Sequence, residues 1–192
     1  MNEEIKAIEY GYDMIKSFLE KLAGPAAEEI GLMIQDQVKF YRFKNQLKIL
    51  NKAKLLLDKN KIEPKTIPLR TLIPLLEGAS LEDNDYLADK WAALISNAAS
   101  GSLNKGNHPS YPKILMELSP IDAVLFDEIY SIDDTIMWSN FKPQFAKNHS
   151  LSIEDVSFSY ENLFRLSLIM NTNNGLYKTY YGKAFFQVCK KR

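Results

Sequence analysis

The stretch from Pro74 to Ser100, PLLEGASLEDNDYLADKWAALISNAAS, decides how the rest of the chain is interpreted. Ser80 has a side chain suited to a helix N-cap, and Asp83 follows it at capping-box spacing. Gly101 predicts the end of the helix, and Trp91 is expected to be the largest anchor of its buried face. Apolar residues recur at steps of three and four, as on one face of a helix: Leu87, Ala88, Trp91, Leu94, Ile95 and Ala98.

The composition is that of an ordinary globular protein, with 192 residues, 46% hydrophobic and 25% charged. Lys plus Arg and Asp plus Glu both number 24, so net charge gives no argument for nucleic acid or membrane. The single cysteine, Cys189, excludes an internal disulfide framework and fits a reducing compartment. No apolar run approaches the roughly 20 residues of a transmembrane helix, and residues 1–16 lack a signal-peptide core. We therefore expect a cytoplasmic protein without a transmembrane segment.

The N-terminal part of the chain predicts long helices. Residues 3–22 show helical spacing, and the run from 26 to about 59 contains no proline and predicts one long helix. Residues 60–80 read as a linker, because Pro64, Pro68 and Pro74 disfavour a continuous helix. Residues 100–112 are rich in turn formers and predict a second loop.

The C-terminal part predicts a smaller module. Ser119 and Pro120 form a helix start, with an N-cap followed by proline at the first helical position. Residues 131–150 show no clear pattern, and Ser152 begins another helix. Two β-prone runs flank residues 171–175 as a hairpin, and residues 183–190 predict a closing helix. The fold class is therefore mainly α, with a helical region at 1–116 and a winged-helix-like module with a small hairpin at 117–192.

Basic residues are concentrated in the long helix between residues 38 and 61, where Asp58 is the single acid. Four of them are candidates for a contact surface toward phosphates, anionic lipid or an acidic partner: Arg42, Lys44, Lys48 and Lys52. The alternative is a solvated helix face whose charges meet the acidic residues near Ser80. This second interpretation is favoured, because basic helix faces are common.

No residue pattern nominates an enzyme. The sequence has no HExxH, CxxC, GxGxxG or P-loop motif, and His108 lacks an evident nucleophile and orienting carboxylate. The acids at 82–89 could bind a metal, but the solvated face of a capped helix explains them as well. We expect no catalytic, cofactor or metal site.

The winged-helix-like order raises the question of DNA binding. The helix that would enter the major groove carries Glu154, Asp155 and Glu161 against Arg165, and the wing offers only Lys178. Since phosphate contacts supply most nonspecific affinity, nucleic acid is weakly supported as a partner. Packing or protein contact is the favoured use of this module.

Several blocks of the sequence resemble the Abi-alpha (abortive infection alpha) family. The most specific are PLLEGASLED…DKWAALISNAA within 74–99 and HPSYPKIL…LSPIDA within 108–126. The run at 24–54 and the ending NLFRLSLI…GKAFFQVC at 162–189 agree with them. The resemblance implies a protein of abortive infection, a defence in which the infected cell stops growing or dies, and it implies no catalytic residues.

Three functional hypotheses follow. The first is a non-enzymatic protein that acts through protein–protein contact or as a homo-oligomer. The second is a DNA-binding regulator that uses the winged-helix-like module. The third is a membrane-active effector that uses the basic helix 38–61.

Overall fold

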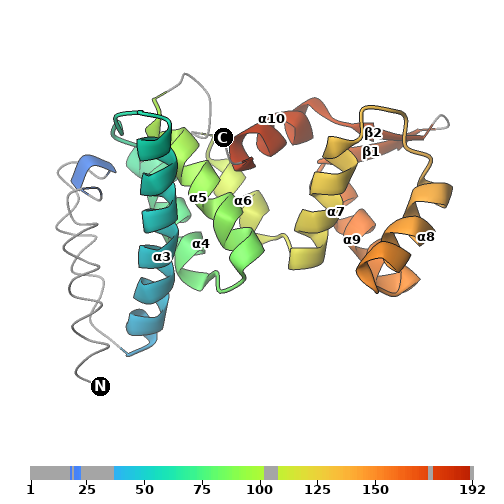
Figure 1. Cartoon of the computed structure of the whole chain (residues 1–192), viewed down its shortest axis with the longest axis horizontal. Helices are drawn as coiled ribbons and strands as arrows, with labels where there is room; N and C mark the ends of the chain where they lie inside the picture. The colour runs from blue at the N-terminus through green and yellow to red at the C-terminus, as the bar shows by residue number, and fades with distance from the viewer. Residues whose placement is uncertain (1–17, 19, 23–36, 102–107, 173–174, 191–192) are drawn as a thin grey trace. The chain divides into compact units, whose positions relative to one another are not determined.

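The structure is a computed structural model that describes residues 18, 20–22, 37–101, 108–172 and 175–190 (Figure 1). The chain forms two compact units, residues 1–116 with 188–192, and residues 117–187. The last residues of the final helix thus group with the first unit, whereas the sequence assigned them to the second module. The described fold is mainly helical with one small antiparallel hairpin, which confirms the predicted mainly-α class with a small C-terminal hairpin.

The first unit is built around helix α3 (Gln37–Lys59), which lies beside α4 (Leu69–Leu81) and α5 (Asp85–Ala99) (Figure 1). A shorter helix, α6 (Ser110–Met116), packs against α4. The long-helix prediction is confirmed over Gln37–Lys59, and its earlier part lies outside the described residues. Most of the predicted helix 3–22 also lies outside them, but Phe18 and Leu22 are described and buried.

The prediction of a linker over 60–80 is confirmed for residues 60–68 and wrong for the rest, because residues 69–81 form helix α4. Pro74 lies inside this helix, where a proline costs about 3 kcal/mol through its missing N–H and its ring clash. The helix buries a continuous apolar side that includes Leu72, Leu75, Leu76 and Ala79. Burying such side chains stabilises by about 1.5–3 kcal/mol each, which outweighs the local penalty. Residues 110–112, expected in the second loop, likewise belong to helix α6.

Ser80 is not the N-cap of the Trp91 helix, which corrects the sequence prediction. It lies in the last turn of α4, and its hydroxyl donates to the carbonyl of Glu77 at 2.6 Å. The N-cap of α5 is Asn84, whose side-chain oxygen accepts from the N–H groups of Tyr86 and Leu87 at 3.0 and 3.1 Å. Two adjacent helices share this stretch, and Ser80 lies in the first of them, so the cap falls to Asn84 at the start of the second.

Trp91 is the central anchor of the first unit, as the sequence predicts. Its side chain is fully buried on α5. The six-membered part of its ring lies against Gly78 of α4, where an added Cβ would come within 2.2 Å of the ring. The close approach of α4 and α5 at this point therefore requires glycine. The helix ends as predicted, with Ser100 as C-cap and Gly101 in the left-handed region at φ 65°.

The second unit contains α7 (Pro120–Ser131), α8 (Trp138–His149) and α9 (Ile153–Arg165), and both α7 and α8 pack against α9. The predicted start of α7 is confirmed in detail. Ser119 accepts from the N–H of Asp122 at 3.1 Å, Asp122 accepts from the N–H of Ser119 at 2.8 Å, and Pro120 opens the helix. Ser152 caps α9 as predicted. Helix α8 is an addition to the prediction; it contains Pro143 and buries only Phe145 and Ala146, so its periodic signal is weak.

The hairpin joins β1 (Ile169–Thr172) to β2 (Gly175–Lys178), and α10 (Tyr180–Cys189) follows it. Met170 pairs with Tyr177, and both side chains are exposed. A single bridge also pairs Ile136, between α7 and α8, with Leu176, whose N–H donates to the Ile136 carbonyl at 2.9 Å. The connection between α7 and α8 therefore extends the hairpin by one residue pair.

Candidate contact surface

Arg42, the first of the four predicted contact residues, serves the packing of α3 on α4. Its Nε donates to the hydroxyl of Ser80 at 2.9 Å. Two neighbouring residues of α3 satisfy carbonyls in the last two turns of α4: Asn45 Nδ2 lies 3.3 Å from the Ser80 oxygen, and Gln46 Nε2 lies 2.8 Å from the Leu76 oxygen. The side chains of one helix thus supply the C-terminal hydrogen bonds of another.

Lys48 and Lys52 connect α3 to the acidic start of α5. Lys48 Nζ lies 2.7 Å from Asp85, and Lys52 Nζ lies 2.9 Å from Asp89 and 3.5 Å from Asp85. The hydrogen bond and charge of Lys48 lower the pKa of Asp85. Burial acts to lower the pKa of Lys52, but its hydrogen bond and charge interaction with Asp89, with the charge of Asp85, outweigh burial and raise it. These lysines meet the acids of the first unit, which agrees with the second interpretation of the stripe.

Lys44 is different, because it is exposed and no hydrogen bond or ion pair holds it among the described residues. It belongs to the solvent side of α3, together with the two apolar side chains of Tyr41 and Leu55, which are 66% and 58% exposed. Steps of three, four and seven residues place these positions on one side of the helix. We call this side the basic face and define it as Tyr41, Lys44, Lys48, Leu55 and Lys59.

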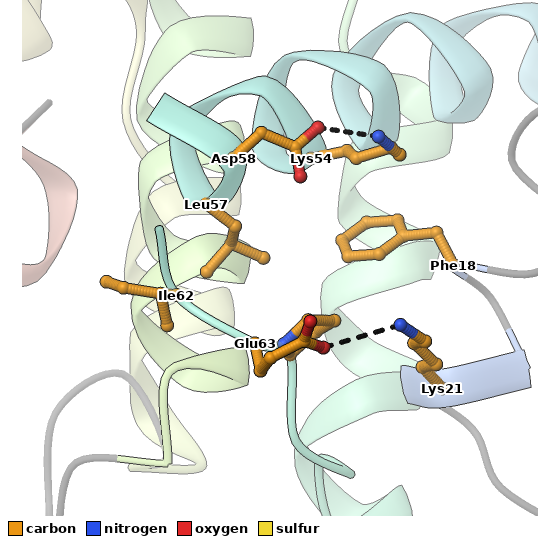
Figure 2. A pocket seen from close by; sticks show the side chains of 8 residues that line it. Phe18, Lys21, Lys54, Leu57, Asp58, Ile62 and Glu63 are labelled. Atoms are coloured by element: carbon orange, nitrogen blue, oxygen red, sulfur yellow. Dashed lines mark hydrogen bonds and ion pairs between the residues drawn. The ribbon is translucent and has the colours of Figure 1, made fainter. Parts of the chain in front are cut away.

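A hollow of about 170 Å³ lies near the C-terminal end of α3 (Figure 2). Its apolar lining includes Phe18, Leu57 and Ile62. Two ion pairs border it, Lys54 with Asp58 at 2.6 Å and Lys21 with Glu63 at 3.4 Å. Each charge on the rim is therefore already compensated by a neighbour of the same chain, and the hollow offers no uncompensated charge to a ligand.

The second unit presents acids where a DNA-binding module would need bases. Arg165 of α9 pairs with Glu117 at 2.6 Å and also contacts the side-chain oxygen of Asn162. Lys178 of the hairpin donates to the carbonyl of Ile132 and, at 3.4 Å, to that of Tyr130. Its charge also lies 5.7 Å from the centre of the Tyr130 ring. Both bases that the sequence nominated for phosphate contact thus stabilise the unit itself.

Glu154, Phe158 and Glu161 lie on the solvent side of α9, and sequence reasoning did not single out this group. All three are exposed, and Phe158 is 75% exposed. The signal was available in the spacing, because positions four and three residues apart share one side of a helix. The sequence reading of the module included the acids of this group but passed over the phenylalanine between them. We call this group the acidic face of α9.

The histidines and acidic residues lie in structural contacts. His149 Nε2 is 2.6 Å from Glu128, and His108 Nδ1 is 2.5 Å from the Ser110 hydroxyl. Within the part of the chain that the structure describes, no three His, Cys, Asp or Glu side chains are grouped as a metal site. In the same residues, no helix has the length and hydropathy needed to cross a bilayer.

These features describe a mainly helical protein with a C-terminal hairpin, in which exposed apolar residues lie beside charges on α3 and α9. The sequence model of the Abortive infection alpha family matches residues 35–185, from just before α3 into α10. The chain therefore belongs to this family, and the resemblance seen in the sequence is confirmed. No curated protein and no solved structure matches the chain.

Proposed function

We propose that the protein takes part in abortive infection in the cytoplasm, and that it acts without catalysis, through protein contact or self-assembly. Membership of the Abortive infection alpha family supports the biological setting. The mode of action is supported by the basic face of α3 and by the absence from the sequence of any pattern that nominates catalytic residues. Cys189, the single cysteine, is buried and fits a reducing compartment.

The observation that carries this proposal is the exposure of Leu55 and Tyr41 on a helix whose other sides are packed. When a partner covers apolar side chains that otherwise stay in water among lysines, the binding free energy becomes more favourable by roughly 25 cal/mol per Å² of apolar surface. Interface anchors are typically such residues, with charged residues at the rim. The basic face has both components within one helix.

The test is a phage-challenge growth curve of cells that carry the protein, compared with cells that carry Leu55→Gln with Lys59→Gln. Both residues are exposed, so the stability of the fold should change by about 0.5 kcal/mol or less per position. We expect protection in the wild type and loss of protection in the variant at an unchanged melting temperature. Affinity purification from the infected culture then identifies what the face binds. A culture that carries the wild type and collapses like the empty-vector control at low phage dose, with an equal phage yield, would contradict the proposal.

A second candidate function is DNA binding, which one observation favours. The single bridge between Ile136 and Leu176 lies between α7 and α8, where a winged-helix module has its first strand, and this supports the resemblance. The commitment of Arg165 and Lys178 to the unit itself argues against it, since phosphate contacts require available bases. A gel-shift assay at low salt tests DNA binding. If no duplex shifts, this candidate function is ruled out.

A further inference from the structure

The two units carry opposite net charges, although the whole chain is neutral. Residues 1–116 with 188–192 contain 19 basic and 15 acidic residues, a net charge of +4. Residues 117–187 contain 5 basic and 9 acidic residues, a net charge of −4. Complementary potentials of this kind attract one copy of a protein to another when the two charged regions face outward.

Two of the exposed apolar residues, Leu55 and Phe158, lie next to charges on these faces. On the basic face, Leu55 is followed by Lys59 one turn later, whereas Lys48, two turns earlier, is already paired with Asp85. On the acidic face, Phe158 is preceded by Glu154 one turn earlier and followed by Glu161. Leu55 beside Lys59 and Phe158 between Glu154 and Glu161 are therefore exposed apolar side chains next to charges of opposite sign.

We infer that the basic face of α3 in one copy docks on the acidic face of α9 in a second copy. Leu55 and Phe158 form the apolar centre of this contact, and lysines meet glutamates around it. Such an arrangement matches the usual anatomy of interfaces, with an apolar core and a polar rim. This inference rests on the proposed function, because it names a second copy of the chain as a partner.

The contact joins two different surfaces, so it is heterologous. After the first contact forms, each copy keeps one unused face, so the pair presents one acidic and one basic face. Such assemblies grow into rings when the rotation closes and into open chains when it does not. Self-assembly would therefore depend on protein concentration, and it would weaken as salt screens the rim charges.

Other partners account for only half of the pattern. An anionic vesicle or a nucleic acid would use the basic face alone, and it would leave Phe158 exposed among glutamates. A second copy uses both faces together. We therefore favour it, and binding to anionic lipid or to duplex DNA becomes an outcome of the test.

The test is sedimentation equilibrium of the full chain over a micromolar concentration series, with two variants. The basic-face variant is Leu55→Gln with Lys59→Glu, and the acidic-face variant is Phe158→Gln with Glu161→Lys. We expect the wild type to self-associate. In each variant the dissociation constant should rise about tenfold or more, as for loss of an interface anchor. Higher salt should weaken wild-type association.

Mixing the two variants tests directly whether the basic face binds the acidic face. Each variant keeps one wild-type face, so the 1:1 mixture should form heterodimers although neither variant associates alone. Matched controls place equivalent changes elsewhere: Leu81→Gln with Lys113→Glu in the first unit, and Met137→Gln with Asp134→Lys in the second. These positions are exposed, and we expect the controls to associate like the wild type.

Three results would overturn the inference: a wild type that stays monomeric, an acidic-face variant that associates normally, or a mixture that forms no heterodimer. A monomer that co-sediments with phosphatidylglycerol vesicles, and loses this with Lys59→Glu, would assign the basic face to lipid instead. Phage protection is scored separately. Protection by a strictly monomeric wild type removes this inference and leaves the proposed function standing.

Discussion

Trp91 and Tyr130 are both large aromatic side chains that lie against a glycine, but their surroundings hold them in different ways. Trp91 packs on Gly78, and its buried indole nitrogen interacts with the Glu82 carboxylate, acting to lower the pKa that burial raises, without reaching standard hydrogen-bond geometry. The Tyr130 hydroxyl donates to the carbonyl of Leu168 at 2.5 Å, and an added Cβ on Gly182 would come within 2.0 Å of it. The first unit therefore depends here on shape, and the second on shape together with a buried hydrogen bond.

This difference has a physical consequence for substitutions. A side chain held by shape can be replaced together with its neighbour, because packing responds to the volume of both residues. A buried hydrogen bond to a backbone carbonyl fixes one partner in space, so compensation is harder. Substitutions at the two anchors test whether they differ in this way.

Trp91→Ala should reduce the free energy of unfolding by about 3–5 kcal/mol, the range for removing a large buried aromatic side chain. A cavity beside Gly78 would remain, because α4 and α5 are also held by α3 and can collapse only in part. Chemical denaturation of the purified variant measures the loss. An unchanged unfolding midpoint would contradict the anchor role of Trp91 in the first unit.

Gly78→Ala and Gly182→Ala should each cost about 1–3 kcal/mol through overpacking, although alanine is the better helix former. A second substitution, at the aromatic partner of each glycine, distinguishes the two sites. Trp91→Phe should recover much of the loss from Gly78→Ala, because that clash involves only side-chain atoms. Tyr130→Phe should recover little of the loss from Gly182→Ala, because the new Cβ would also lie 2.3 Å from the Leu168 carbonyl oxygen.

Double-mutant cycles on the free energies of unfolding measure both pairs. Ala184→Gly is a matched control on the exposed side of α10, and it should cost about 1 kcal/mol by helix propensity alone. Equal coupling energies in the two pairs would show that shape governs both anchors. The proposed difference between the two units would then be wrong.

Tyr130→Phe should cost about 1 kcal/mol at neutral pH through loss of one buried hydrogen bond. Burial raises the pKa of Tyr130 to about 12 in the folded protein, from 10.0 in the unfolded chain. The neutral form is therefore favoured by folding, and its contribution is full below pH 10 and is lost as pH rises through about 12. Between pH 10 and 12 the wild type should lose more stability than the phenylalanine variant, and a constant difference would contradict this.

Glu82→Gln should stabilise the first unit slightly at neutral pH, by about 0.5 kcal/mol or less. Burial raises the pKa of Glu82, so the folded state favours the protonated form and the charge at neutral pH opposes folding. The hydrogen bond that Glu82 accepts from the N–H of Asn84 at 2.9 Å can be kept by glutamine. The gain should vanish as pH falls below 4.5, where the carboxyl is protonated in both states. Urea unfolding at the two pH values measures it, and Asp83→Asn is the exposed control.

The sequence alone predicted those features that are encoded within a few neighbouring residues. The capping box of Ser119, Pro120 and Asp122 is local, because a side chain and a backbone N–H three residues apart form it. The periodic face around Trp91 and the turn between the strands are local in the same sense. The family was also evident from short blocks within 74–99 and 108–126.

Tertiary structure alone decided what residues far apart in the chain do to each other. Residues 69–81 are helical despite Pro74, because burial against α3 and α6 outweighs a local penalty that the sequence displays. Lys48 and Lys52 pair with acids 37 residues away on α5, while Lys44 has no such partner within the part of the chain that the structure describes. The equal charges of the stripe in the sequence do not indicate this division. Interactions between residues close in sequence can be predicted from the sequence, but the free energy of burial and of ion pairing depends on which elements meet in space.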